Sequence, residues 1–131
     1  MSRYLLDANV LIALTVAEHE HHRRATAWLA TVDGFAVCPV VEGALVRFLA
    51  RLGERPAVAV EIFRAVGTHP RGQFWPDSLS YADVELARVR GHRQVTDAYL
   101  AGLAVANGGR LATLDAALAQ TLPDAVVLID D

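Results

Sequence analysis

Residues 4–14 read YLLDANVLIAL, and the order of apolar and polar positions in this stretch decides the fold. Residues 4–6 predict a short buried strand, which Asp7 ends. Residues 9–17 then carry apolar side chains at helical spacing, so a helix follows the strand almost directly. A buried strand that leads straight into a helix is the first half of the βα unit from which parallel sheets are built.

The rest of the chain repeats this alternation. Further strands are predicted at residues 35–37, 73–75, 110–113 and 125–129. Helices are predicted at residues 21–32, 39–52, 55–66, 81–89, 97–107 and 116–120, with Thr96 as the cap of the fifth and Gly53 and Gly108 as stops. The pattern predicts one domain, residues 1–131, with an α/β fold: a three-layer α/β/α sandwich around a central, mainly parallel sheet.

The composition of the chain indicates an ordered domain and bears on its cellular compartment. Hydrophobic residues make up 53% of the chain and its mean hydropathy is +0.29, which favours an ordered core over disorder. No apolar run approaches the roughly 20 residues of a membrane span, and the N-terminus carries no secretory signal pattern. Cys38 is the single cysteine, so we interpret it as a small buried hydrophobic residue and expect a cytoplasmic protein without membrane contact.

The formal net charge of −3 does not suggest a nucleic-acid binder, because such domains are commonly basic. All twelve basic residues are nevertheless arginines. Each basic contact is therefore a planar, fork-shaped guanidinium suited to phosphate, and chemistry that needs a catalytic lysine is excluded.

Four acidic residues share one topological position. Asp7 and Asp115 each follow a predicted strand, whereas Glu42 and Asp97 each lie in the first turn of a predicted helix. In a parallel sheet, strand ends and the helix starts that follow them meet at one edge, where open α/β sheets bind ligands. Two such charges about 4 Å apart repel by about 4 kcal/mol at an effective dielectric constant of about 20, so a divalent cation would stabilise the cluster. Oxygen ligands favour Mg²⁺ or Mn²⁺.

Taken singly, each acid has a simpler interpretation. Asp7 and Asp115 are residues of a helix cap or turn, Asp97 complements a helix dipole, and Glu42 is a solvated surface residue. Their shared position favours the joint site. The other aspartates that lack such a placement are interpreted as turn, cap or tail residues: Asp33, Asp77, Asp83, Asp124, Asp130 and Asp131.

A carboxylate-held cation activates water and stabilises charge on a phosphate, which indicates phosphodiester hydrolysis. We assign Asp7 and Asp97 as metal ligands, Asp115 as a further ligand or holder of a second ion, and Glu42 as the group that orients or deprotonates water. The uncharged neighbours that could orient these groups are Asn9, Thr96 and Thr113. The basic residues before Asp97 either grip phosphates beside the cleft or form a solvated face; they are Arg88, Arg90 and Arg93.

Two other features have simpler explanations than chemistry. Residues 18–22 read EHEHH, but adjacent histidines on a helix point in different directions, which favours a solvated helix start over a zinc site. Trp75 could stack on an unpaired base, and core or dimer packing is the interpretation that we prefer.

The sequence resembles the PIN-domain family, in particular the VapC-type toxins of bacterial toxin–antitoxin pairs. The matching segments are YLLDANVL at residues 4–11, PVVE at 39–42, TDAYLA at 96–101 and LATLD at 111–115, together with FWPD at 74–77. The resemblance implies a Mg²⁺- or Mn²⁺-dependent endoribonuclease directed at transfer or ribosomal RNA, a homodimer, and a small antitoxin that blocks the cleft. It maps the family's acids onto Asp7, Glu42, Asp97 and Asp115. Ala116 stands where some members have another acid, which puts a full second metal site in doubt.

Competing functions are separated by residues or by assay. A phosphate-accepting receiver domain needs a lysine that this chain lacks. A DNA or flap nuclease of the wider family is disfavoured by the small size. A catalytically inactive PIN-fold interaction module is the alternative that only an activity measurement distinguishes from the ribonuclease.

Overall fold

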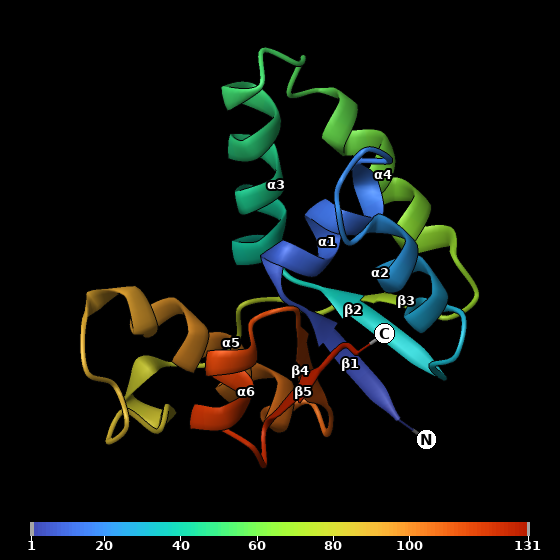
Figure 1. Ribbon diagram of the computed structural model, residues 1–131. Coiled ribbons are helices and arrows are strands. Elements are labelled where there is room, and N and C mark those ends of the chain that lie inside the picture. Colours follow the sequence, from blue (N-terminus) through green and yellow to red (C-terminus); the bar gives the residue numbers. More distant parts are fainter. Residues whose placement is uncertain (1, 131) are drawn as a thin grey trace.

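The computed structural model describes residues 2–130; positions 1 and 131 of the predicted domain, Asp131 included, lie outside the described residues. Five parallel strands form one sheet in the order β3-β2-β1-β4-β5 (Figure 1). They are β1 (Arg3–Leu6), β2 (Gly34–Val37), β3 (Gly72–Phe74), β4 (Arg110–Thr113) and β5 (Val126–Leu128). The predicted α/β sandwich with a parallel sheet is confirmed.

Six helices join these strands. The strand order places α1 to α4 on one face of the sheet and α5 and α6 on the other, because parallel crossovers are right-handed and the chain reverses its direction across the sheet after β3. The helices are α1 (Ala8–Thr15), α2 (His22–Leu29), α3 (Pro39–Arg51), α4 (Val58–Thr68), α5 (Val95–Ala106) and α6 (Ala116–Thr121). Within residues 2–130, no helix is long and apolar enough to cross a membrane.

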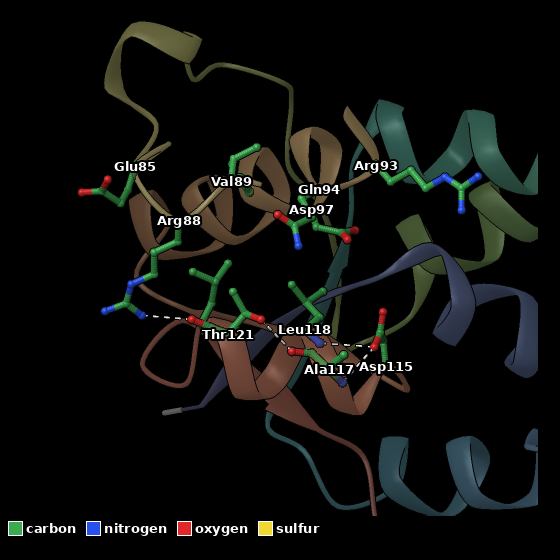
Figure 2. A pocket seen from close by; sticks show the side chains of 12 residues that line it. Glu85, Arg88, Val89, Arg93, Gln94, Asp97, Asp115, Ala117, Leu118 and Thr121 are labelled. Carbon is green, nitrogen blue, oxygen red and sulfur yellow. Dashed lines mark hydrogen bonds between the residues drawn. The ribbon is translucent and has the colours of Figure 1, made fainter. Parts of the chain in front are cut away.

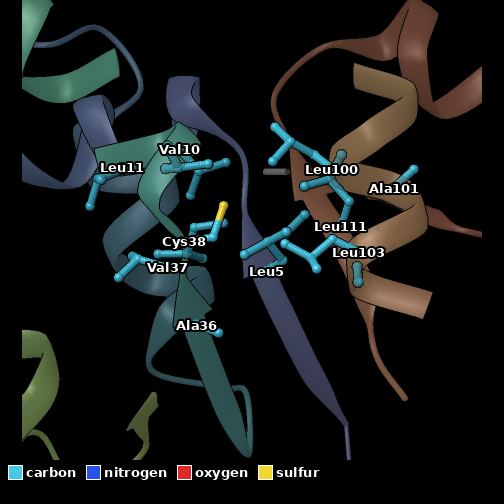
Figure 3. Close-up of a cluster of buried hydrophobic side chains, with 14 of the residues drawn as sticks. Leu5, Val10, Leu11, Ala36, Val37, Cys38, Leu100, Ala101, Leu103 and Leu111 are labelled. Carbon is cyan, nitrogen blue, oxygen red and sulfur yellow. The ribbon is translucent and has the colours of Figure 1, made fainter. Parts of the chain in front are cut away.

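The core surrounds the central strand. Leu5 and Leu6 of β1 are at most 1% exposed, and all four residues of β2 are buried. Figure 3 shows Leu5 of β1 between Val10 of α1 and Leu111 of the neighbouring strand β4. Strands covered on both faces need apolar residues in succession, which explains the short continuous apolar runs of the sequence.

The direction in which the chain adds successive strands across the sheet reverses between β1 and β4. From β1 the chain moves outward to β2 and β3, then crosses back to β4 and continues to β5. β1 and β4 are therefore neighbours whose carboxyl ends lie at one edge, and the N–H of Asp7 donates to the carbonyl of Ala112 at 2.9 Å. Open α/β sheets bind ligands at such a switch point, so the topology selects this edge for the site.

The structure corrects one predicted helix. Residues 81–89 are not a helix: only a 3₁₀ turn, η1 (Tyr81–Asp83), forms, and the Ser80 hydroxyl closes it by accepting from the N–H of Ala82. Val84 is then extended and 8% exposed, because its side chain packs beside Gly102 of α5. Burial of this one side chain overrides the local helical pattern.

The segment before α5 also differs from the prediction. A second 3₁₀ turn, η2 (His92–Gln94), leads into the helix, which begins at Val95 with Gln94 at the N-cap position and no capping bond from its side chain, so the prediction of Thr96 as the cap is wrong. The predicted C-terminal stops of two helices are confirmed. Gly53 and Gly108 follow the ends of α3 and α5 and have positive φ angles of 81° and 77°.

Candidate active site

Asp7 lies at the junction of β1 and α1 and is buried, with 7% of its surface exposed. One carboxylate oxygen caps α1 by accepting from the N–H of Ala8 at 2.8 Å. The other accepts from the hydroxyl of Thr113 at 2.7 Å. The helix-cap interpretation of Asp7 is therefore confirmed, and the residue also lies at the sheet edge where the site is predicted. Burial raises the pKa of this carboxyl, the two hydrogen bonds lower it, and the charge of Asp115 raises it further.

Thr113 connects the ends of β1 and β4. Its fully buried hydroxyl donates to Asp7 and accepts from the Asn9 amide at 3.2 Å and from the N–H of Asp115 at 3.1 Å. Asn9 completes the link by accepting from the N–H of Leu114 at 3.2 Å. A hydroxyl can donate one hydrogen bond and accept two, so this group is saturated. Thr113 and Asn9 thus occupy positions from which they fix the orientation of Asp7.

Asp115 caps α6 from the exposed rim of the site. One of its oxygens accepts from the N–H groups of Ala117 at 3.0 Å and Leu118 at 3.2 Å, as Figure 2 shows. Its second oxygen has no hydrogen-bond partner within residues 2–130. That oxygen is available to a ligand without loss of the cap.

Asp97 faces these two acids from the first turn of α5. Its carboxylate is half-buried, and neither oxygen has a hydrogen-bond donor among residues 2–130. Burial, followed by the charges of Asp7 and Asp115, raises the pKa of Asp97 to about 6. No arginine of the described chain lies within ion-pair distance of these three acids. The structure therefore brings together three carboxylates that lack a counter-charge.

The donor set of these three residues suits a hard divalent cation, since every ligand atom is a carboxylate oxygen. Within the described residues, however, no group of three or more acidic, histidine or cysteine side chains is already arranged as a metal site. Asp97 and Asp115 both have free oxygens, so rotation of short side chains could close the set around an ion. The residues present fit Mg²⁺ or Mn²⁺ in chemistry and charge.

Glu42 lies in the first turn of α3. It is half-buried, and its pKa is raised by burial and by the charge of Asp77, with no contribution from the other three acids. Asp77 is a residue that the sequence analysis missed, having interpreted it as a turn residue. It follows β3, so the strand-end rule that selected Asp7 and Asp115 would have selected it as well. The acids at the carboxyl edge of the sheet therefore include Asp77 beside Glu42, in addition to Asp7, Asp97 and Asp115.

A pocket of about 300 Å³ opens beside Asp97 and Asp115, between η2, α5 and α6. Arg88 and Arg93 line it, and Arg88 donates to the carbonyl of Thr121 at 2.9 Å (Figure 2). Arg90 does not line the pocket; its guanidinium lies 3.4 Å from the carbonyl of Ala87.

Thr96 lies in the first turn of α5, exposed and next to Asp97. Its hydroxyl has no hydrogen-bond partner within residues 2–130, in contrast to the hydroxyl of Thr113. In this structure Thr96 therefore orients none of the acids.

The other residues singled out in the sequence are structural in this fold. Trp75 is 6% exposed and its indole N–H donates to Gln73 at 2.9 Å, so it belongs to the core. Cys38 is fully buried, and burial raises the pKa of its thiol to about 11. A ring nitrogen of His22 lies 2.8 Å from the carbonyl of Ala13, and no metal-binding group forms around residues 18–22 of the described chain.

Comparison with known proteins gives consistent matches. The family model described as "PIN domain" matches residues 4–121. Ribonuclease VapC29 of Mycobacterium tuberculosis is 59% identical over 126 residues, which covers 95% of each chain. Ribonuclease VapC39 of the same organism is 38% identical, with 89% of this chain and 91% of that protein covered.

Two solved structures share the fold. The complex VapBC2 of Rickettsia felis, bound to a DNA fragment from its promoter, contains a chain that matches with a TM-score of 0.67 and 18% identity, covering 98% of this chain and 99% of that one. VapC20 of Mycobacterium tuberculosis, described as a sarcin–ricin loop cleaving toxin, matches with a TM-score of 0.63 and 20% identity, covering 91% and 94%. At these identities the likeness concerns the fold alone.

The contribution of the Thr113 hydroxyl, which bonds to Asp7, Asn9 and the N–H of Asp115, can be tested by removing it. Thr113→Val keeps the shape of the side chain and leaves buried polar groups of Asp7 and Asn9 unpaired, so we expect a loss of about 1–3 kcal/mol in the free energy of unfolding. Urea denaturation measures it. Thr68→Val, which removes an exposed hydroxyl bonded to Ala65, is the matched control. An equal loss of unfolding free energy in the two variants would contradict the stabilising role of the Thr113 hydroxyl.

The repulsion around Asp97 predicts a pH effect on the metal-free protein. Its folded pKa of about 6 lies above the ordinary aspartate pKa of 3.8, so the folded chain retains a proton that the unfolded chain releases. Stability should therefore fall as pH rises from about 4 to about 6 and change little from this group above that range. Urea unfolding in EDTA across these pH values should show a smaller fall for Asp97→Asn than for the wild type. Asp33→Asn, at the opposite edge of the sheet, should behave as the wild type does.

Proposed function

The chain belongs to the PIN-domain family, and from this membership we propose that it is a VapC-type endoribonuclease, the toxin of a toxin–antitoxin pair. The observation that carries the proposal is the trio Asp7, Asp97 and Asp115 at the sheet's switch point, in a chain 59% identical to a ribonuclease. The substrate class that the family resemblance suggests is transfer or ribosomal RNA.

We infer that Mg²⁺ or Mn²⁺ is held by Asp7 and Asp97, with Asp115 completing the set. Such an ion supplies a more acidic bound water and stabilises the charge that develops on the phosphate. Thr113 keeps Asp7 in one orientation, so that oxygen is presented from a fixed position. The free oxygens of Asp97 and Asp115 can adjust to the ion at little cost, because they are not engaged elsewhere in the described chain.

Glu42 is the group that we propose receives a proton from the attacking water. Burial and the neighbouring Asp77 raise its pKa, and a carboxylate with a raised pKa is a stronger base. Because Glu42 is not one of the proposed metal ligands, it can accept a proton without releasing the ion. Asp77 would then contribute through its charge on Glu42.

RNA would be held by arginines beside the acids. Arg88 and Arg93 line the pocket next to Asp97 and Asp115, whereas Arg90 does not line it. Each guanidinium offers a planar fork that fits phosphate oxygens. These local cations offset the unfavourable net charge of −3 where the backbone of the RNA would lie.

The partners and setting follow from the same proposal. A small antitoxin is expected to cover the acidic edge, and the structural match to a chain of a VapBC complex supports such a partner. A homodimer and a cytoplasmic location are part of the proposal; large exposed apolar side chains such as Val105 of α5, 55% exposed, support self-association.

The catalytic proposal is tested by single substitutions in a cleavage assay on total RNA. Asp7→Asn and Asp97→Asn should each lower the rate by about a hundredfold or more, because each removes a carboxylate ligand of the proposed ion that stabilises charge on the phosphate. Cleavage by the wild type should require Mg²⁺ or Mn²⁺ and stop in excess EDTA. Asp33→Asn, an exposed acid at the far edge of the sheet, is the matched control and should cleave normally.

The two alternatives give opposite results in that assay. A catalytically inactive interaction module would leave RNA intact under every condition, with wild type and variants alike. Cleavage that persists in EDTA, or in Asp97→Asn at the wild-type rate, would show that the metal site is assigned wrongly. Circular dichroism of each variant separates loss of chemistry from loss of fold.

The toxin role predicts a partner and a growth effect. Production of the wild-type chain alone should arrest growth, and Asp7→Asn should relieve the arrest because cleavage is lost. Co-production with the small protein encoded beside it should restore growth and yield a complex on size-exclusion chromatography. Normal growth with the active wild-type enzyme, and no complex, would count against this role.

A further inference from the structure

Two different segments of the chain line opposite sides of the pocket beside Asp97 and Asp115. Val89 and Gln94 approach from the segment before α5, and Leu118 and Leu122 come from α6 and the residue after it (Figure 2). Its volume of about 300 Å³ is at the lower end of the range of about 300–1,000 Å³ for small-molecule sites. Apolar side chains close together suit a flat aromatic group, and the volume suits one such group only.

Gln94 places a fixed hydrogen-bond donor in this pocket. Its side-chain oxygen accepts from the N–H of Arg90, which decides which end of the amide is oxygen and which is nitrogen. The amide nitrogen has no acceptor within residues 2–130. An amide held in this way presents N–H groups, and only N–H groups, to whatever enters.

Charges at the rim determine how a ligand would lie. Asp97 and Asp115 line one end of the pocket, where the proposed cut takes place. Arg88 keeps further donors free after its single bond to Thr121, and Arg93 lines the pocket from η2. A ligand with an anionic backbone and a flat apolar ring satisfies the arginines and the pocket together.

We propose that this pocket receives the unpaired base of the nucleotide next to the cleaved phosphate, and that Gln94 selects the base by donating a hydrogen bond to its edge. The inference rests on the proposed ribonuclease function and adds a source of sequence preference to it. Guanine and uracil carry a carbonyl oxygen at the position where adenine and cytosine carry an amino group. A donor at Gln94 therefore favours the two keto bases.

The experiment uses single-stranded RNA with a randomised centre, cut by the full-length protein in Mg²⁺, with both product ends sequenced. The wild type should favour guanine or uracil at one position beside the cut by about tenfold, the worth of one good hydrogen bond against an unpaired donor. Gln94→Leu removes the donor and should bring that preference close to one.

Gln94→Glu keeps the oxygen that accepts from Arg90 and replaces the free donor by an acceptor. The preference at the same position should therefore turn toward adenine and cytosine, whose amino groups can donate. Gln120→Leu is the matched control, because Gln120 is exposed on α6 and does not line the pocket. It should keep the wild-type preference.

The outcomes separate this inference from the function on which it rests. Metal-dependent cleavage with the same base preference in the wild type and both Gln94 variants would overturn the subsite and leave the ribonuclease intact. A uniform slowing of all sequences in the variants would show a structural role for Gln94 and would equally overturn it. Absence of cleavage by the wild type would overturn both proposals.

Discussion

The hydrogen bond from the Thr113 hydroxyl to Asp7 is the contact on which the rest of the site depends. It joins the ends of β1 and β4, the two strands between which the chain reverses its direction across the sheet. The same hydroxyl accepts from Asn9 and from the N–H of Asp115, so one buried atom fixes three groups of the site. A buried carboxylate is costly without partners, and this bond together with the cap on α1 makes the burial of Asp7 tolerable.

No side chain of the described residues neutralises the repulsion between the carboxylates of the site, and the proposed chemistry depends on that uncompensated charge. Asp7 and Asp97 both have raised pKa values, from burial first and from neighbouring acids second. The trio lacks a cationic side chain within ion-pair distance in the described chain, although twelve arginines are present in the sequence. A site that keeps arginines at its rim and not among its acids leaves the charge for a divalent ion to neutralise, which is what the proposed hydrolysis requires.

In the proposed function, the arginines and Gln94 bind the substrate, whereas the acids hold the ion and act on water. The segment that carries them is neither the predicted helix nor a loose loop, because Val84 packs beside Gly102 and the η2 turn leads directly into α5. This path holds Arg88 against Thr121 and places Gln94 over α6, forming the pocket next to Asp97. In the proposed function, the chemistry takes place at the sheet edge, and an irregular segment built on that edge selects the substrate.

The sequence by itself determined the fold class, the parallel strands and the positions of Asp7, Asp97 and Asp115, because continuous apolar strands and helix stops such as Gly108 are local signals. It also indicated Asn9 and Thr113 as neighbours of the acids. Only the tertiary structure decided that the charge of Asp77 acts on Glu42, that residues 84–89 are not helical, and that Gln94 and Leu118 line one pocket. These depend on contacts between residues far apart in the chain, and local propensity yields to such contacts whenever a side chain such as Val84 gains more from burial.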